Sequence, residues 1–259
     1  MIFSNQKNLH NPASIKRKIY LFVSERTFPE LIKEILNNGF PLFRRLVGLY
    51  FDKKFDRKYN VDTCGSIHLQ ELTIDSNNVK SGTIYDPIPI KTLKTLFSYL
   101  PYNLSEYNFI DFGSGKGRAL LVASDYPFRK IIGVEFAHEL HQVALSNLEQ
   151  YNNPKQKCFD IESICVDAVN FPIPQGKCLF FFFAPFGSDI FSKVIENIQK
   201  SYTDSPRNML ILYVTDPITD PLPVDEIRSC SLFEKINGGY LPLDLAQRYT
   251  LYYELYQAN

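Results

Sequence analysis

The strongest constraint on the fold is an alternation that begins near Asn108. From there on, short apolar runs are separated by amphipathic stretches with helical spacing. Near-continuous apolar strands separated by helices are typical of a parallel sheet that is covered on both faces. The pattern predicts strands over 109–112, 131–136, 164–166, 179–183 and 209–214, and helices over 117–126, 138–151 and 187–201.

The end of the chain has a different pattern. Apolar and polar residues alternate over 249–256, which indicates a strand, and a further strand is predicted over 232–236. No helix-length stretch has to cross over between them, so we expect an antiparallel pair. The predicted fold is α/β: a doubly wound, mostly parallel seven-strand sheet with a C-terminal antiparallel hairpin and an N-terminal helical extension.

The first third of the chain reads as an extension to this sheet. Residues 12–60 have helical spacing, with a stop predicted at Gly39 and a restart after Pro41. Residues 60–88 are rich in Gly, Asn and Pro and predict loops, and residues 89–100 predict a helix. The predicted domains are a basic helical extension with connecting loops over 1–84 and the main domain over 85–259.

Charge and cysteine usage narrow the function classes. The 259 residues carry 28 basic and 28 acidic side chains, so net charge gives no sign of nucleic-acid binding. The first 60 residues hold 12 Lys/Arg against 5 Asp/Glu. This excess leaves a peripheral membrane contact or an acidic partner open, although solvated charges are the more common explanation. Five cysteines without a C-x-x-C pair, a polar start and the lack of a long apolar run predict a cytoplasmic chain without a transmembrane segment.

The most informative segment is Asp111-Phe-Gly-Ser-Gly-Lys-Gly-Arg118. It follows a predicted buried strand and leads into a helix. Glycines at such a turn let a ligand approach the backbone, and the helix N-terminus presents free N–H groups. The spacing is G-x-G-x-G, whereas the dinucleotide fingerprint is G-x-G-x-x-G. Asp111 precedes the first glycine by two residues, where a carboxylate would repel a pyrophosphate and would suit an amine.

Acidic residues also end the next two predicted strands. Glu135 closes the second strand, where a carboxylate can accept both hydroxyls of a ribose, and Phe136 follows it. Asp167 and Ala168 follow the third strand, within reach of an adenine amine. Each acid alone is also explained as a helix N-cap. Because the carboxyl ends of parallel strands line the ligand crevice of an open α/β sheet, the combination favours a nucleoside-containing ligand.

These motifs together resemble the class I, seven-strand S-adenosylmethionine-dependent methyltransferases, over about residues 85–256. Asp111-Phe-Gly-Ser-Gly-Lys-Gly-Arg followed by Gly133-Val-Glu-Phe136 resembles the branch that contains non-SET lysine methyltransferases. The resemblance implies S-adenosylmethionine as cofactor, with its methionine part on the glycine segment, its ribose on Glu135 and its adenine at Asp167. The implied cofactor residues are Tyr85, Asp111, Gly113, Ser114, Gly115, Gly117, Glu135, Phe136, Asp167, Ala168 and Phe183.

The resemblance also implies where the methyl acceptor binds, at the end of the fourth predicted strand. Ala184, Pro185 and Phe186 follow it and are expected to face the substrate. Many relatives have Asn or Asp at the position of Ala184, and an alanine side chain can neither accept a hydrogen bond nor take a proton. This departure puts transfer to an amino group in doubt. No catalytic base can be assigned, since Tyr85, Asp189 and Tyr240 are not ranked by the sequence.

Other charged side chains give weaker signals. Lys116 and Arg118 flank the glycines and either attract an acidic group or are solvated. His138 and His141 share a predicted helix but have no third ligand nearby, so no metal site is predicted. The leading hypothesis is methyl transfer to an unidentified protein or small molecule. The alternatives are a catalytically inactive cofactor-binding module, a nicotinamide-dependent oxidoreductase and a nucleic-acid methyltransferase.

Overall fold

The computed structural model describes residues 40–68, 71–72, 82, 84–100, 103–217, 225–228, 230–242 and 251–258. The chain divides into two compact units, 1–46 and 47–259, and the second holds the whole sheet. The helical prediction for 12–39 lies outside the described residues. Helix α3 (Phe40–Tyr59) begins where the second N-terminal helix is expected, with Pro41 in its first turn, where a missing N–H is tolerated.

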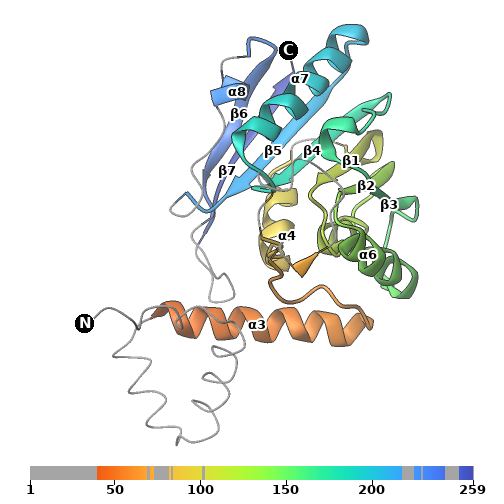
Figure 1. Cartoon of the computed structure of the whole chain (residues 1–259), viewed down its shortest axis with the longest axis vertical. Coiled ribbons are helices and arrows are strands. Elements are labelled where there is room, and N and C mark those ends of the chain that lie inside the picture. Colours follow the sequence, from red (N-terminus) through yellow and green to blue (C-terminus); the bar gives the residue numbers. More distant parts are fainter. Residues whose placement is uncertain are drawn as a thin grey trace, which may run out of the picture. The chain divides into compact units, whose positions relative to one another are not determined.

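The second unit is built on a seven-stranded mixed sheet (Figure 1). This sheet confirms the predicted fold class. The strand order is β3-β2-β1-β4-β5-β7-β6. The first five strands run parallel, and β7 pairs antiparallel with both β5 and β6. The strands are β1 (Tyr107–Phe112), β2 (Lys130–Glu135), β3 (Ile161–Cys165), β4 (Lys177–Phe183), β5 (Met209–Thr215), β6 (Phe233–Tyr240) and β7 (Tyr252–Ala258).

Alternating side chains of the central strands feed two separate cores. On β4, Leu179 and Phe181 belong to one apolar cluster, and Phe180 and Phe182 belong to the other. The first cluster includes residues of α4 and α5, and the second includes the buried face of α7, so helices cover both faces of the sheet. The helices of this unit after α3 are α4 (Ile90–Ser98), α5 (Arg118–Ala123), α6 (His138–Gln150), α7 (Ser188–Asp204) and α8 (Asp225–Arg228).

Both edge strands of the sheet differ from the predicted elements. Strand β3 begins at Ile161, three residues before the predicted start. The apolar pattern misses this first half because it carries the polar Glu162 and Ser163. Strand β6 extends to Tyr240 through mostly exposed residues, which give no apolar run to detect. In the part of the chain that is described, no helix is both long and apolar enough to cross a membrane.

Candidate cofactor site

The glycine turn (residues 113–117) connects β1 to α5 and is held against β2. The N–H groups of Gly113 and Ser114 both donate to the carbonyl of Val134, at 2.9 and 3.1 Å. Gly113 and Gly115 have φ angles of +75° and +54°, which side-chain-bearing residues rarely adopt. Both glycines are also covered: a Cβ on Gly115 would lie 2.2 Å from Cε2 of Tyr85. The turn therefore requires glycine for its backbone conformation and for the close approach of its neighbours.

Gly115→Ala is expected to lower the free energy of unfolding by about 2 kcal/mol or more, from left-handed backbone strain and displacement of the Tyr85 ring. Gly65→Ala is the matched control. Gly65 has a φ of +91°, but a Cβ there would meet nothing within 4 Å. Urea denaturation of both variants separates the two costs, and equal losses of stability would show that Tyr85 does not press on the turn.

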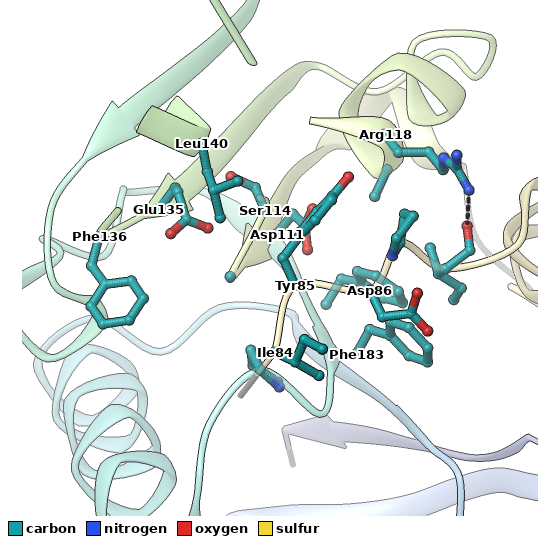
Figure 2. Close-up of a pocket in the computed structure, with 16 residues that line it drawn as sticks. Ile84, Tyr85, Asp86, Asp111, Ser114, Arg118, Glu135, Phe136, Leu140 and Phe183 are labelled. Carbon is teal, nitrogen blue, oxygen red and sulfur yellow. Dashed lines mark hydrogen bonds between the residues drawn. The ribbon is translucent and has the colours of Figure 1, made fainter. Parts of the chain in front are cut away.

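Two buried carboxylates lie beside this turn. Asp111 on β1 and Glu135 at the end of β2 are each 4% exposed. Glu135 accepts hydrogen bonds from the N–H of Gly115 at 2.7 Å and from the N–H of Ala137 at 2.9 Å. It thereby links the glycine turn to the start of α6. Figure 2 shows Asp111, Ser114 and Glu135 on the same side of the pocket.

Burial makes both carboxyl groups hard to ionise. It raises the pKa of Asp111 to about 8, and the neighbouring charge of Glu135 adds to this effect. Burial also raises the pKa of Glu135, although the N–H donors of Ala137, Gly115 and Phe136 oppose it. Without a ligand, Asp111 is therefore mostly protonated near neutral pH. A cation placed beside it would favour the ionised form.

Two adjoining pockets open at the carboxyl ends of the parallel strands. The first has a volume of about 630 Å³ and is lined on one side by Asp111, Ser114 and Glu135. The second has a volume of about 380 Å³ and is lined mainly by apolar residues, with Asp167 at its wall. Gly113, Phe136 and Pro185 line both pockets. Together they form a polar compartment next to an apolar one.

The structure brings most of the predicted cofactor residues to these two pockets. The first pocket holds Tyr85, Asp111, Gly113, Ser114, Glu135, Phe136 and Phe183, and the second holds Gly113, Phe136, Asp167 and Ala168. Gly115 and Gly117 shape the turn but line neither pocket. Asp167 also accepts a hydrogen bond from the N–H of Val169 at 3.1 Å, so it caps the short 3₁₀ turn that follows it.

The three residues expected to face the acceptor do not line the same pocket. Pro185 lines both pockets and Phe186 lines only the second, whereas Ala184 lines neither. Ala184 has a φ of +39°, in the left-handed region where Asn and Asp are enriched among non-glycine residues. The backbone at this strand end thus has the conformation that a polar residue would favour, without the polar side chain.

Several lining residues carried no signal in the sequence. Leu140 lies in the first turn of α6, and Ile84 and Asp86 flank Tyr85. Val166 and Ile190 form apolar walls of the second pocket. In a sequence, an apolar residue that lines a pocket cannot be told from an ordinary core residue. Asp86 lies in the stretch 60–88, whose composition predicts only loops.

The sequence leaves two interpretations of Lys116 and Arg118 open, and the one that has them as solvated charges is wrong. Arg118 is 2% exposed, and its Nη1 lies 2.9 Å from Oδ1 of Asp52. Lys116 is 6% exposed, and its Nζ lies 3.0 Å from both carboxylate oxygens of Asp62. Burying a charge is costly unless it is paired, which accounts for both contacts. Arg118 lines the first pocket, but its charge is balanced by Asp52.

The polar groups of the first pocket suit a cationic ligand with hydroxyl groups. Asp86, Asp111 and Glu135 all line it, and its one arginine is already paired. The Oγ atom of Ser114 is buried and has no hydrogen-bond partner among the described residues. Such a group usually has a partner in a complete site. An ammonium, a ribose and a sulfonium all fit this donor and acceptor set, and S-adenosylmethionine carries the three.

In the described ranges, no group of three or more His, Cys, Asp or Glu side chains could hold a metal ion. Nδ1 of His141 lies 2.9 Å from Oγ of Ser163, so this ring has a structural partner. Of the three unranked bases, only Tyr85 lines a pocket, and burial raises its pKa far above the usual value. Asp189 and Tyr240 are exposed and line neither pocket.

Comparison with known proteins gives likeness at the level of structure only. No family model and no curated protein matches the sequence. Similar solved structures include a mutant of MtNAS in complex with S-adenosylmethionine (TM-score 0.48, 16% identity, 65% of this chain and 61% of that chain). They also include a ribosomal protein L11 methylase from Lactobacillus delbrueckii subsp. bulgaricus (0.45, 12%, 65% and 78%).

A third similar structure is an S-adenosylmethionine-dependent methyltransferase from Leishmania major (TM-score 0.45, 13% identity, 64% of this chain and 70% of that chain). The chain spans about three fifths of the MtNAS chain and more of the other two. At such low identities, any inference about chemistry has to rest on the residues of the two pockets. The topology of the sheet itself shows an α/β fold of the Rossmann-like type.

Proposed function

We propose that this chain binds S-adenosylmethionine and transfers its methyl group to a protein or small-molecule nucleophile. The observation that carries the proposal is the joint placement of Asp111, Glu135 and Asp167 around two adjoining pockets at the ends of three neighbouring strands. A glycine turn with buried N–H donors completes the arrangement. The similar solved structures are in keeping with this function.

Each part of the cofactor has a matching group in this proposal. Asp111 would hold the amino group, Glu135 would accept the ribose hydroxyls, and Asp167 would meet the adenine amine beside Phe136. When bound, the cofactor supplies a methyl group on a sulfonium, which is already activated for displacement. The chain has to orient the acceptor and exclude water. Tyr85, Phe183 and Pro185 provide the apolar and aromatic walls for that task.

Ala184 supports one alternative, a module that binds the cofactor without transferring its methyl group. The alanine side chain offers an acceptor no hydrogen bond. Its left-handed backbone nevertheless has the conformation that suits Asn. Methyl transfer by the wild type, measured with radiolabelled cofactor, would exclude the inactive module. Cofactor binding without any transfer to proteins or metabolites of the source cell would support it.

S-adenosylhomocysteine at about 100 times its dissociation constant is expected to stabilise the fold by about 2.7 kcal/mol. For a unit of this size that is a rise in Tm of about 5 to 10 °C. NAD should cause no rise, because the first pocket is lined by three carboxyl groups and its one arginine is already paired, which leaves a pyrophosphate no cationic partner there. Glu135→Gln should lose most of the rise, since one carboxylate oxygen becomes an NH₂ group beside backbone N–H donors.

Glu162→Gln is the matched control, because Glu162 lies on β3, lines neither cofactor pocket and pairs with Lys130 at 3.0 Å. It should keep the full rise in Tm. If S-adenosylhomocysteine does not stabilise the wild type, the chain does not bind this cofactor. A rise with NAD alone would instead support the oxidoreductase alternative.

A further inference from the structure

Residues 52–64, which the sequence assigns to a peripheral extension, are in direct contact with the glycine turn. We call Asp52, Asp56, Asp62, Thr63 and Cys64 the N-terminal clamp. All five lie in the same compact unit as the sheet. They contact Lys116, which belongs to the turn, and Arg118, which follows it. The contacts join segments more than 50 residues apart in the sequence, and they range from part-buried at Lys116 to buried at Arg118.

Thr63 is the centre of the clamp and is completely buried. Its Oγ1 accepts a hydrogen bond from Nε of Arg118 at 2.8 Å and donates one to Oδ1 of Asp56 at 2.6 Å. Its carbonyl accepts a hydrogen bond from the hydroxyl of Tyr85 at 2.9 Å. One residue thereby connects helix α3, the start of α5 and the ring that covers Gly115.

A second set of contacts holds the other side of the turn. Nδ2 of Asn147 on α6 donates to the carbonyls of Asp62 and Lys116, at 2.8 and 2.9 Å. The N–H of Asp62 donates in return to Oδ1 of Asn147 at 2.7 Å. Nζ of Lys116 also donates to the carbonyl of Cys64 at 3.1 Å. The clamp, the turn and α6 therefore form one connected hydrogen-bond network.

The network ends on two walls of the first pocket. Tyr85 and Arg118 both line it, and Tyr85 approaches Gly115 so closely that no Cβ fits between them. We propose that Thr63 is a positioning residue for the cofactor pocket, which sets the separation of the Tyr85 ring from the glycine turn through its carbonyl and hydroxyl. This inference rests on the proposed function, because the pocket it shapes is the proposed cofactor pocket.

The test compares Thr63→Val, which keeps the shape and removes the hydroxyl, with Thr63→Ser, which keeps the hydroxyl. Calorimetric titration with S-adenosylhomocysteine at 15 °C, where all variants are folded, should give a dissociation constant at least about tenfold weaker for Thr63→Val. Thr63→Ser should stay within about threefold of the wild type. Recovery by the hydroxyl would assign the effect to its hydrogen bonds.

Arg207→Gln controls for a loss of stability alone. Arg207 donates to the carbonyls of Pro174, Gly176, Ser201 and Ser205, and it lines neither cofactor pocket. This variant should melt at a lower temperature and keep the wild-type dissociation constant within about twofold. If Thr63→Val does not fold, Tyr85→Phe replaces it, because this variant keeps the ring and removes only the hydrogen bond to the carbonyl of Thr63.

Hydrogen exchange without any cofactor gives the second readout. Amides of the glycine turn should exchange faster in Thr63→Val, and in Tyr85→Phe, but not in Arg207→Gln. A folded Thr63→Val or Tyr85→Phe variant with wild-type affinity and wild-type exchange in the turn would overturn the inference. If the wild type binds no S-adenosylhomocysteine, the proposed function fails, while the exchange comparison still decides whether Thr63 positions the turn.

Discussion

Asp111→Asn is expected to stabilise the fold near neutral pH and to weaken binding of S-adenosylhomocysteine by at least about 30-fold. Burial raises the pKa of Asp111 from 3.8 to about 8. Between these two values the folded chain keeps a proton that the unfolded chain has lost. The free energy of unfolding of the wild type therefore falls as pH rises, by up to about 1.4 kcal/mol per pH unit from this group.

Asn cannot ionise, so the variant lacks this contribution. The difference in unfolding free energy between Asp111→Asn and the wild type should grow from pH 4 to pH 8, and reach a change on the order of 4 kcal/mol near pH 7. Comparing the two slopes removes the contributions of other groups, such as Glu135, whose pKa burial also raises. Urea denaturation at several pH values measures both slopes, and parallel slopes would show that Asp111 is ionised in the folded chain.

The same substitution removes the carboxylate proposed to hold the amino group of the cofactor. In the wild type, binding should strengthen as pH rises toward 8, because the complex requires ionised Asp111, and should weaken once the ligand's amine loses its proton. Asp111→Asn should lose the acidic limb of this profile. A substitution that improves stability and impairs binding is typical of a functional group held in an unfavourable environment.

The central strands of the sheet and the acidic residues of the cofactor site could be predicted because their signals are local. Each central strand of the sheet is a short apolar run, and each acid at a strand end stands directly after such a run. Parallel strands place these ends together without any knowledge of side-chain contacts. Glu135 and Asp167 therefore come to neighbouring pockets, as the order of β1, β2 and β3 in the sheet requires.

The environment of Arg118 could not be predicted in the same way. A basic residue at a helix start is usually solvated, and nothing near it in the sequence indicates burial. Its partners Asp52 and Thr63 lie 66 and 55 positions earlier, in a segment whose own pattern indicates only a helix and a loop. Pairing between distant charges has no periodicity, so the sequence alone assigned residues 52–64 to a separate extension.

A chain that begins at residue 85, the predicted start of the main domain, is expected not to form a stable fold. Removing Asp52 and Thr63 leaves the guanidinium of Arg118 buried without its partners, and such a loss typically costs about 3–5 kcal/mol. Val61 would also no longer cover the apolar patch at Leu121 and Tyr151. Since whole domains are stable by about 5–15 kcal/mol, the combined loss removes most of the stability.

A chain that begins at Phe40, the first residue of α3, retains every contact of the clamp and is expected to fold cooperatively. Near-ultraviolet circular dichroism and thermal melting would compare the two shortened chains. Arg118→Met in the chain that begins at residue 85 should restore part of the lost stability, because it removes the unpaired buried charge. At about 2–4 °C for each kcal/mol, a loss of about 3–5 kcal/mol should separate the two melting temperatures by about 6–20 °C. If the chain that begins at residue 85 instead melts cooperatively within about 3 °C of the longer one, the clamp is dispensable for the fold and the predicted division before residue 85 is correct.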